Sequence, residues 1–169
     1  GASISTKDYN DHGEYAYISM ATIKKWRFDS ETAAIVDVSY SDKNCNKSVK
    51  KNDIIMARSG EGTIGKVALI EDDIKGIFAD FTMRIRLENY NPYFAYYYFR
   101  TSFFQYLIEI YKKGLGNNTN IFPVVIKELP IPNVSLNEQE IIVSKIKKDM
   151  DQQLIIRKHI ESVRNKISR

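Results

Sequence analysis

Short apolar segments alternate with polar and glycine-containing stretches along the first half of the chain. Segments of this kind, rich in β-branched and aromatic side chains, are typical of β-strands. The predicted strands cover residues 15–19, 33–40, 54–57, 67–70, 76–79 and 81–87. In the last strand, Met83, Ile85 and Leu87 alternate with Arg84 and Arg86, so it would have one apolar and one basic face. The two arginines would either contact phosphate or simply be solvated or salt-bridged.

Helical patterns are predicted at three places. A short helix at residues 20–26 would follow the first strand, with Ser19 as its cap. Residues 93–111 are expected to form one long, aromatic and largely buried helix, since Asn91 is a typical cap and Pro92 suits the first helical position. From residue 136 to the end no Gly or Pro interrupts the chain, so a single long helix is predicted there.

Apolar residues recur at steps of three and four along this last segment, with a slip near Gln153. The stripe that we expect to form a packing interface consists of Ile142, Ile146, Met150, Ile156, Ile160, Val163 and Ile167. A lone helix cannot bury such a stripe by itself. It would therefore lie against a helix of the same molecule, a second copy of the chain or another subunit.

Together these elements predict an α+β fold: a mixed β-sheet domain with a buried aromatic helix, followed by a long C-terminal coiled-coil-type helix. We expect the domain at residues 15–134 and the helix at residues 135–169. Residues 1–14 are polar and expected to be loose, and Gly1, Ala2 and Ser3 look like a cloning remnant.

The charge and the cysteine content limit the kinds of partner and site that this chain could have. Lys and Arg exceed Asp and Glu by 25 to 21, a mild excess that is compatible with an anionic partner. The single cysteine, Cys45, excludes an internal disulfide and a cysteine-based zinc cluster, and suits a cytoplasmic location. We expect no cofactor, because no glycine-rich methyl-donor pocket set in a βαβ unit is evident, and no metal, because the sequence has no His-Cys-carboxylate cluster and only two histidines, His12 and His159. No apolar run is long enough for a membrane span, so no membrane is expected as a partner.

The glycine-rich stretch between residues 58 and 66 partly fits several nucleotide-binding patterns. Gly60, Gly62 and Gly65 match the dinucleotide and kinase spacings, and Gly65 with Lys66 falls one residue short of a P-loop. A Rossmann or P-loop turn must open a helix, whereas Lys66 to Ile70 has the pattern of a strand. We therefore interpret this stretch as a hairpin turn, and a nucleotide-binding enzyme is the less favoured alternative.

Candidate nucleic-acid contacts gather at three stretches of polar and basic residues. Cations neutralise phosphates, while amide and guanidinium groups can bind base edges. The candidate DNA-binding residues are Lys24, Lys25, Arg27, Arg58, Ser59, Lys112, Lys113, Asn117, Asn118 and Asn120. The plainer interpretations are a solvated helix end near Trp26 and an ordinary turn at residues 114–120, and the sequence does not decide between them. No catalytic residue is expected.

An ordered set of short motifs resembles a known family. It comprises the run from Asp53 to Gly60, Gly65–Lys66–Val67, Asn91–Pro92–Tyr93, the glycine loop at Gly114, and Leu129–Pro130–Ile131–Pro132 followed by residues 138–142. Together these motifs resemble the specificity subunit of type I restriction-modification enzymes, over residue 15 to the C-terminus. The family's usual opening, a tryptophan-containing segment and a Leu-Gly-Asp-Ile-type strand, does not occur here.

The resemblance implies one target recognition domain followed by one spacer helix, which is half of a specificity subunit. The implied function is recognition of double-stranded DNA at one part of a bipartite site, without catalysis by the chain itself. The implied partners are an adenine methyltransferase subunit and, indirectly, the restriction subunit, and a homodimer through the helix is possible. Two alternatives stay open: a recognition domain from a fused N6-adenine methyltransferase, and a helical scaffold that does not read DNA.

Overall fold

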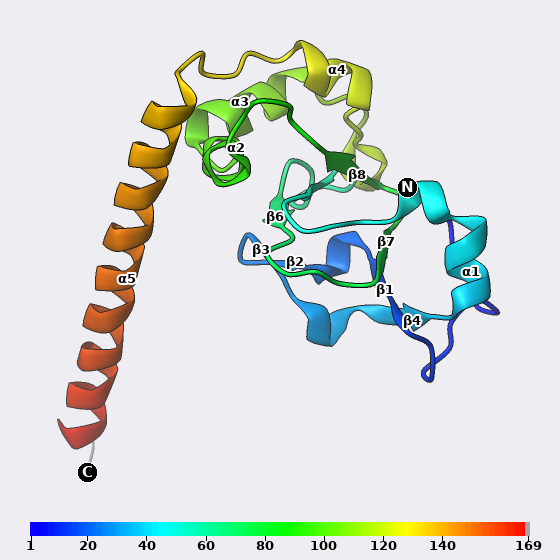
Figure 1. The fold of residues 1–169 in the computed structure, drawn as a ribbon, viewed down its shortest axis with the longest axis horizontal. Coiled ribbons are helices and arrows are strands. Elements are labelled where there is room, and N and C mark those ends of the chain that lie inside the picture. Colours follow the sequence, from blue (N-terminus) through cyan, green and yellow to red (C-terminus); the bar gives the residue numbers. More distant parts are fainter. Residues whose placement is uncertain (168–169) are drawn as a thin grey trace.

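The structure, a computed structural model, describes residues 1–167 with the exception of the Asn117 side chain. It shows an α+β domain from which one long helix projects (Figure 1), so the predicted fold class is confirmed. The strands are β1 (Tyr15–Ile18), β2 (Ile23–Lys24), β3 (Arg27–Phe28), β4 (Ala34–Val36), β5 (Ile54–Ala57), β6 (Val67–Leu69), β7 (Gly76–Phe78) and β8 (Thr82–Ile85). The helices are α1 (Val38–Lys43), α2 (Pro92–Phe99), α3 (Ser102–Tyr111), α4 (Pro123–Glu128) and α5 (Leu136–Ile167).

The described strands form three small sheets. In the first, β1 pairs antiparallel with β4 and parallel with β7. The second is the β2–β3 hairpin, and in the third β5 pairs antiparallel with β6 and β8. The hairpin predicted around the glycine-rich stretch is confirmed as β5–β6. Gly60, Gly62 and Gly65 in its loop all have positive φ, which glycine adopts at little steric cost.

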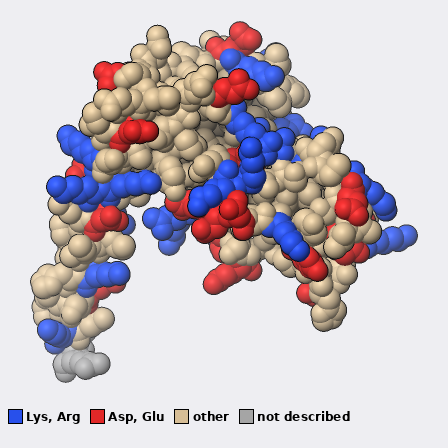
Figure 2. All heavy atoms as spheres, in the orientation of Figure 1, with Lys and Arg blue, Asp and Glu red and all other residues tan. Residues whose placement is uncertain are grey.

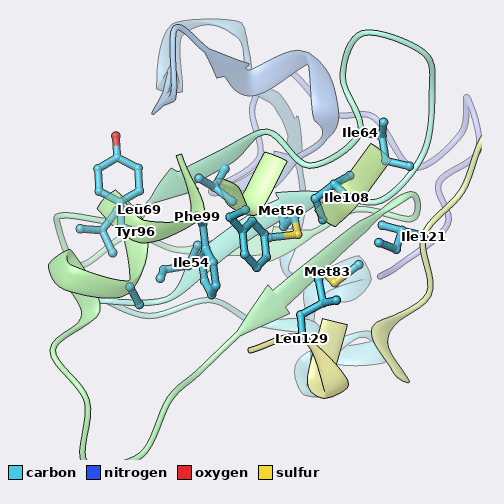
Figure 3. Close-up of a cluster of buried hydrophobic side chains, with 13 residues drawn as sticks. Ile54, Met56, Ile64, Leu69, Met83, Tyr96, Phe99, Ile108, Ile121 and Leu129 are labelled. Carbon is cyan, nitrogen blue, oxygen red and sulfur yellow. The ribbon is translucent and has the colours of Figure 1, made fainter. Parts of the chain in front are cut away.

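Strand β5 is buried on both faces. Ile54 and Met56 belong to a core cluster with residues of α2, α3, β6 and β8, part of which is drawn in Figure 3. Ile55 and Ala57 point to the opposite face and join a second cluster with residues of β1, β2, β6 and β7. Because side chains alternate along a strand, four consecutive apolar residues fill two cores, and none of the four is more than 2% exposed.

The N-terminal residues are folded against the domain rather than loose, contrary to the sequence-based expectation. Ala2 is buried and pairs with Ala79, with Ala2 N donating to Phe78 O at 2.9 Å. The Tyr17 hydroxyl donates to Ala2 O and the Tyr40 hydroxyl to Ser3 O, each at 2.7 Å. Small and polar residues can extend a sheet when tyrosines satisfy their carbonyls, a long-range effect that the local pattern does not reveal.

The helix predicted at residues 20–26 is wrong beyond its first turn. Ser19 does cap a 3₁₀ turn at Met20–Thr22, but the chain then forms the β2–β3 hairpin. The two residues at the hairpin tip, Lys25 and Trp26, both have positive φ, the conformation of the two-residue turns that join antiparallel strands. The basic cluster is therefore a hairpin tip and not a helix end.

The strand predicted at residues 33–40 is also shorter than expected. It ends at Val36, because the Asp37 carboxylate accepts a hydrogen bond from Tyr40 N at 2.9 Å and caps α1. An aspartate in this position favours the start of a helix over continuation of a strand.

Residues 93–111 form two helices instead of the single one predicted. The Asn91 side chain caps α2 as expected, accepting from Tyr93 N and Phe94 N, but Thr101 caps a second helix by accepting from Phe104 N at 3.2 Å. The expectation of a largely buried helix also fails on the outer side of α3. The exposed apolar residues there are Phe103, Tyr106, Ile110 and Tyr111.

Helix α5 is attached to the domain only along its first turns. Gln139 is 1% exposed: its Oε1 accepts from Asn91 N at 2.8 Å and its Nε2 donates to Val134 O at 2.9 Å. Val143 is buried, and Lys147 Nζ lies 3.4 Å from the centre of the Tyr93 ring. Every residue from 151 to 167 is exposed, so the rest of the helix stands free of the domain (Figure 1). No described helix is both long and apolar enough to cross a membrane.

We predict that Gln139→Ala lowers the free energy of unfolding by about 1–3 kcal/mol, because Asn91 N would lose its partner in a buried place. Glu140→Ala, an exposed neighbour on the same turn, is the matched control and should change stability little. Urea denaturation of the two variants measures the difference. Equal stabilities would show that the Gln139 amide does not anchor the helix.

Candidate nucleic-acid interface

Two loops that are far apart in the sequence lie side by side in the structure. Beyond the end of β5, the chain pairs with residues 119–121: Ile121 N donates to Arg58 O at 2.8 Å and Gly60 N to Thr119 O at 3.0 Å. Lys113 and Asn120 exchange two backbone hydrogen bonds of 2.8 and 2.7 Å. The glycine loop of the hairpin and the asparagine loop after α3 therefore form one continuous surface, which we call the loop platform (residues 58–66 and 113–121).

The side chains on the loop platform differ in what they can reach. Ser59 is buried and its hydroxyl donates to Thr119 O at 3.1 Å, so this side chain joins the two loops and does not face solvent. Asn120 Nδ2 donates to Asn118 O at 2.9 Å. Asn118 and Lys113 are exposed. The side chain of Asn117 lies outside the described part of the structure.

Of the two lysines that end α3, only Lys112 has an ion pair in the described structure, with Glu109 at 2.6 Å. Lys113 belongs to the loop platform through its backbone, and its exposed side chain has no carboxylate partner among the described residues. A cation that is not already neutralised is better placed to bind phosphate.

Arg58 leaves the end of β5 next to the turn that joins β7 to β8. Its guanidinium donates to Asp80 Oδ1 at 3.0 Å and lies 5.5 Å from the centre of the Phe81 ring. Partial burial raises the pKa of the Asp80 carboxyl, but hydrogen bonds from Phe81 N, Arg58 and Ser3 outweigh this and hold that pKa below its ordinary value. Asp80 is therefore ionised at neutral pH and keeps Arg58 in place.

The β2–β3 basic residues lie on a different surface. Lys24 pairs with Asp29 at 2.9 Å, whereas Lys25 and Arg27 line a cleft of about 690 Å³ between the domain and the middle of α5. Across this cleft, α5 contributes Lys147 and Arg157. The other charged residues that line it are Arg100, Glu71 and Asp151. Cations thus outnumber carboxylates five to two, and none of the loop-platform residues lines the cleft.

Arg100 completes the basic side of this cleft and was not singled out from the sequence. Its guanidinium lies over the rings of Trp26, Tyr96 and Tyr97, at 6.0, 5.0 and 5.8 Å from their centres. The Tyr96 hydroxyl donates to Trp26 O and fixes the hairpin tip on α2. Arg100 lies close to Trp26 in space and not in the sequence, so it could have been assigned to this cluster only after the hairpin that carries Trp26 was known.

The basic face predicted on β8 is largely occupied by internal contacts. Arg86 forms two hydrogen bonds to the buried Asp53 carboxylate, at 2.5 and 2.8 Å. Arg84 donates to Ser48 O and stacks over Phe78 at 5.1 Å. The salt-bridged interpretation is therefore confirmed for Arg86.

Figure 2 shows Lys and Arg side chains gathered over the middle of the visible face and along the half of α5 nearest the domain.

The predicted packing stripe on α5 falls into two parts. Ile146 and Met150 are half-buried near the domain, whereas Ile142 is exposed and Val143 takes the fully buried place beside it. Further along, the apolar side chains have no cover within the described chain. The exposed members of the stripe there are Ile156, Ile160, Val163 and Ile167.

Two solved structures have folds similar to this one. One, from work on the assembly and conformational transition of the type I R-M system, has a TM-score of 0.65 and 15% identity, and covers 90% of this chain and 39% of that one. The other, a type I restriction-modification S subunit from M. genitalium, has a TM-score of 0.56 and 22% identity, and covers 85% and 33%. This chain thus spans well under half of either. No curated protein matches it.

The family follows from a match to almost the whole sequence. A family model described as the type I restriction modification DNA specificity domain matches residues 1–164. The chain therefore belongs to the type I restriction-modification DNA specificity domain family, and the resemblance noted from its motifs is confirmed.

We predict that Asp80→Asn lowers the free energy of unfolding at neutral pH by up to about 1 kcal/mol, because a partly exposed ion pair is lost. The carboxylate has a folded-state pKa below its unfolded value, so it stabilises the fold above the unfolded pKa of about 4. This contribution disappears as the pH falls through the folded-state pKa.

The stability gap between the variant and the wild type should therefore narrow at acid pH. Urea denaturation at about pH 7 and about pH 3 tests this, with the exposed Asp72→Asn as the matched control. A stability gap that persists unchanged at the lower pH would contradict the role assigned to the Asp80 charge.

Proposed function

We propose that this chain recognises double-stranded DNA as one half of a type I specificity subunit. The observation that carries the proposal is the loop platform, where two loops chosen independently from the sequence meet on one surface that includes Arg58 and Lys113. Loops held by a rigid framework are the usual place for recognition residues. Membership of the DNA specificity domain family supports the same conclusion.

Binding would involve two kinds of contact. Lys25, Arg27 and Lys113 are exposed and would neutralise phosphates, joined by Lys112 and Lys24 when their carboxylate partners are displaced. The groups that would face base edges are Arg58, Asn117, Asn118 and Asn120. Ser59 would act indirectly, because its hydroxyl holds the two loops together. Phosphate contacts would supply most of the affinity, and the base contacts the sequence preference.

Helix α5 would act as the spacer to a second recognition unit. Its 32 residues correspond to a length of about 48 Å at 1.5 Å per residue. The exposed residues from Ile156 to Ile167 would pack against a helix of an adenine methyltransferase subunit or of a second copy. With two recognition units the target would be bipartite, and the restriction subunit would be directed to it through the assembly.

Two alternatives remain distinguishable. If the chain is the C-terminal recognition domain of a fused N6-adenine methyltransferase, the same gene would also encode the catalytic domain and would not lie beside a separate methyltransferase gene. If it is a helical scaffold, it would not bind duplex DNA at all. The exposed apolar stripe of α5 suits both the spacer and the scaffold, so DNA binding is the property that separates them.

The proposal predicts salt-dependent binding to a random-sequence duplex. The fluorescence anisotropy of a labelled duplex, measured across salt concentrations with and without the methyltransferase subunit, should give an affinity that falls steeply with salt. Lys113→Ala and Lys25→Ala should each reduce the slope of log K against log salt by about 0.9, because each removes about one phosphate contact.

The control is Lys43→Ala, an exposed lysine at the end of α1, which should leave the slope unchanged. Absence of salt-dependent binding in both the isolated chain and the complex would refute DNA recognition and favour the scaffold. A slope altered by Lys113→Ala but not by Lys25→Ala would restrict the interface to the loop platform.

A further inference from the structure

Phe81 occupies a backbone conformation that aromatic residues rarely adopt. It lies in the turn between β7 and β8 with a φ of 60°, and its side chain is 49% exposed. Trp26 is also an aromatic residue with positive φ, but it packs against the core. Asn52 and Asn89 have positive φ as well, and asparagine adopts this conformation more readily than other non-glycine residues. For Phe81, no burial in the core compensates the strained backbone.

One carboxylate oxygen links this turn to Arg58. Asp80 Oδ1 accepts one hydrogen bond from Phe81 N at 2.9 Å and another from the Arg58 guanidinium at 3.0 Å. In addition, Arg58 N donates to Phe81 O at 2.9 Å. The phenyl ring and the guanidinium are thus fixed next to each other by both backbone and side chain, which orients the pair before any ligand arrives.

Arg58 belongs to the loop platform, and Phe81 lies directly beside it. Arg58 N is bonded to Phe81 O, and Arg58 O accepts from Ile121 N on its other side. Phe81, Arg58 and Ile121 therefore lie on three adjacent backbone segments. Strained, exposed residues that the surrounding structure holds in place are concentrated at binding sites.

We infer that Phe81 and Arg58 form a two-residue reader of DNA bases, in which the phenyl ring packs on the C5 methyl of a thymine and the guanidinium binds O6 and N7 of the neighbouring guanine. The inference rests on the proposed function and assigns it a site. Apolar contact with the thymine methyl and bidentate arginine contact with guanine are the major-groove interactions that these two side chains make. Asp80 is a positioning residue, since it orients both without reaching the base itself.

The test is selection from duplexes with a randomised central segment, using the wild-type chain, Phe81→Ala, Phe81→Gly and the control Asn89→Gly. We expect the wild type and the control to select the same sequence. Both Phe81 variants should lose the preference for one thymine while keeping the salt slope of the wild type. Phe81→Gly should be at least as stable as Phe81→Ala in thermal unfolding, because glycine relieves the positive φ.

A second measurement separates the methyl contact from a general defect. Replacing the selected thymine by uracil removes only the methyl group, and should weaken wild-type binding by about fourfold. Phe81→Ala should bind the two duplexes equally. Arg58→Lys should lose the preference for the adjacent guanine and retain that for thymine, because a lysine cannot form the bidentate contact.

The outcomes separate this inference from the proposed function. If the wild type selects a sequence and Phe81→Ala selects the same one, the reader is refuted while DNA recognition stands. Equal weakening of the wild type and Phe81→Ala by uracil also refutes it. If the wild type selects no sequence, with or without the methyltransferase subunit, both the proposed function and the reader are wrong.

Discussion

The burial of β5 on both faces is the constraint on which the rest of the domain depends. Its four consecutive apolar residues contribute alternately to the two larger core clusters, so both clusters share this strand. Displacing β5 by one residue would exchange the side chains between the clusters, and Met56 would have to fit where Ile55 or Ala57 now lies. Its register is therefore tightly specified, as are the positions of the residues that follow it.

The register of β5 also fixes the positions of Arg58 and Ser59. They follow strand β5, the Arg58 backbone is bonded to the β7–β8 turn on one side and to Ile121 on the other, and the Ser59 hydroxyl donates to Thr119 O. A side chain that leaves a rigid strand end is better oriented than one on a free loop. The polar residues of the loop platform thus owe their arrangement to apolar residues several positions away.

The sequence predicted the elements that depend on local pattern. The alternation in β8, the glycine hairpin, the Asn91 cap and the uninterrupted α5 all carry their signal within a few residues. The wrong predictions have one of two physical causes. Either a second local signal competed with the first, or the structure depends on contacts distant in sequence. Thr101 divides an aromatic run that has helical composition throughout, and the β2–β3 tip uses positive φ without glycine.

The candidate site shows the same division. Arg58 and the asparagine loop could be chosen by residue type and spacing, but their meeting depends on hydrogen bonds across about sixty residues of sequence, which no local pattern reports. Phe81 escaped notice because an aromatic residue between two strands normally indicates more strand. Only its φ marks it as unusual.

Helix α5 is held at its N-terminal end, which we call its clamp, and projects beyond it as an arm. Its clamp includes Gln139, Val143 and the Lys147–Tyr93 contact, and every described residue of the arm beyond Met150 is exposed. That arm is about 25 Å long, so a tilt of about 10° at the clamp would carry its tip through roughly 4 Å. That displacement slightly exceeds the 3.4 Å rise of one DNA base pair, so under the proposed spacer role the stiffness of this clamp would limit how finely α5 could set distance along a duplex.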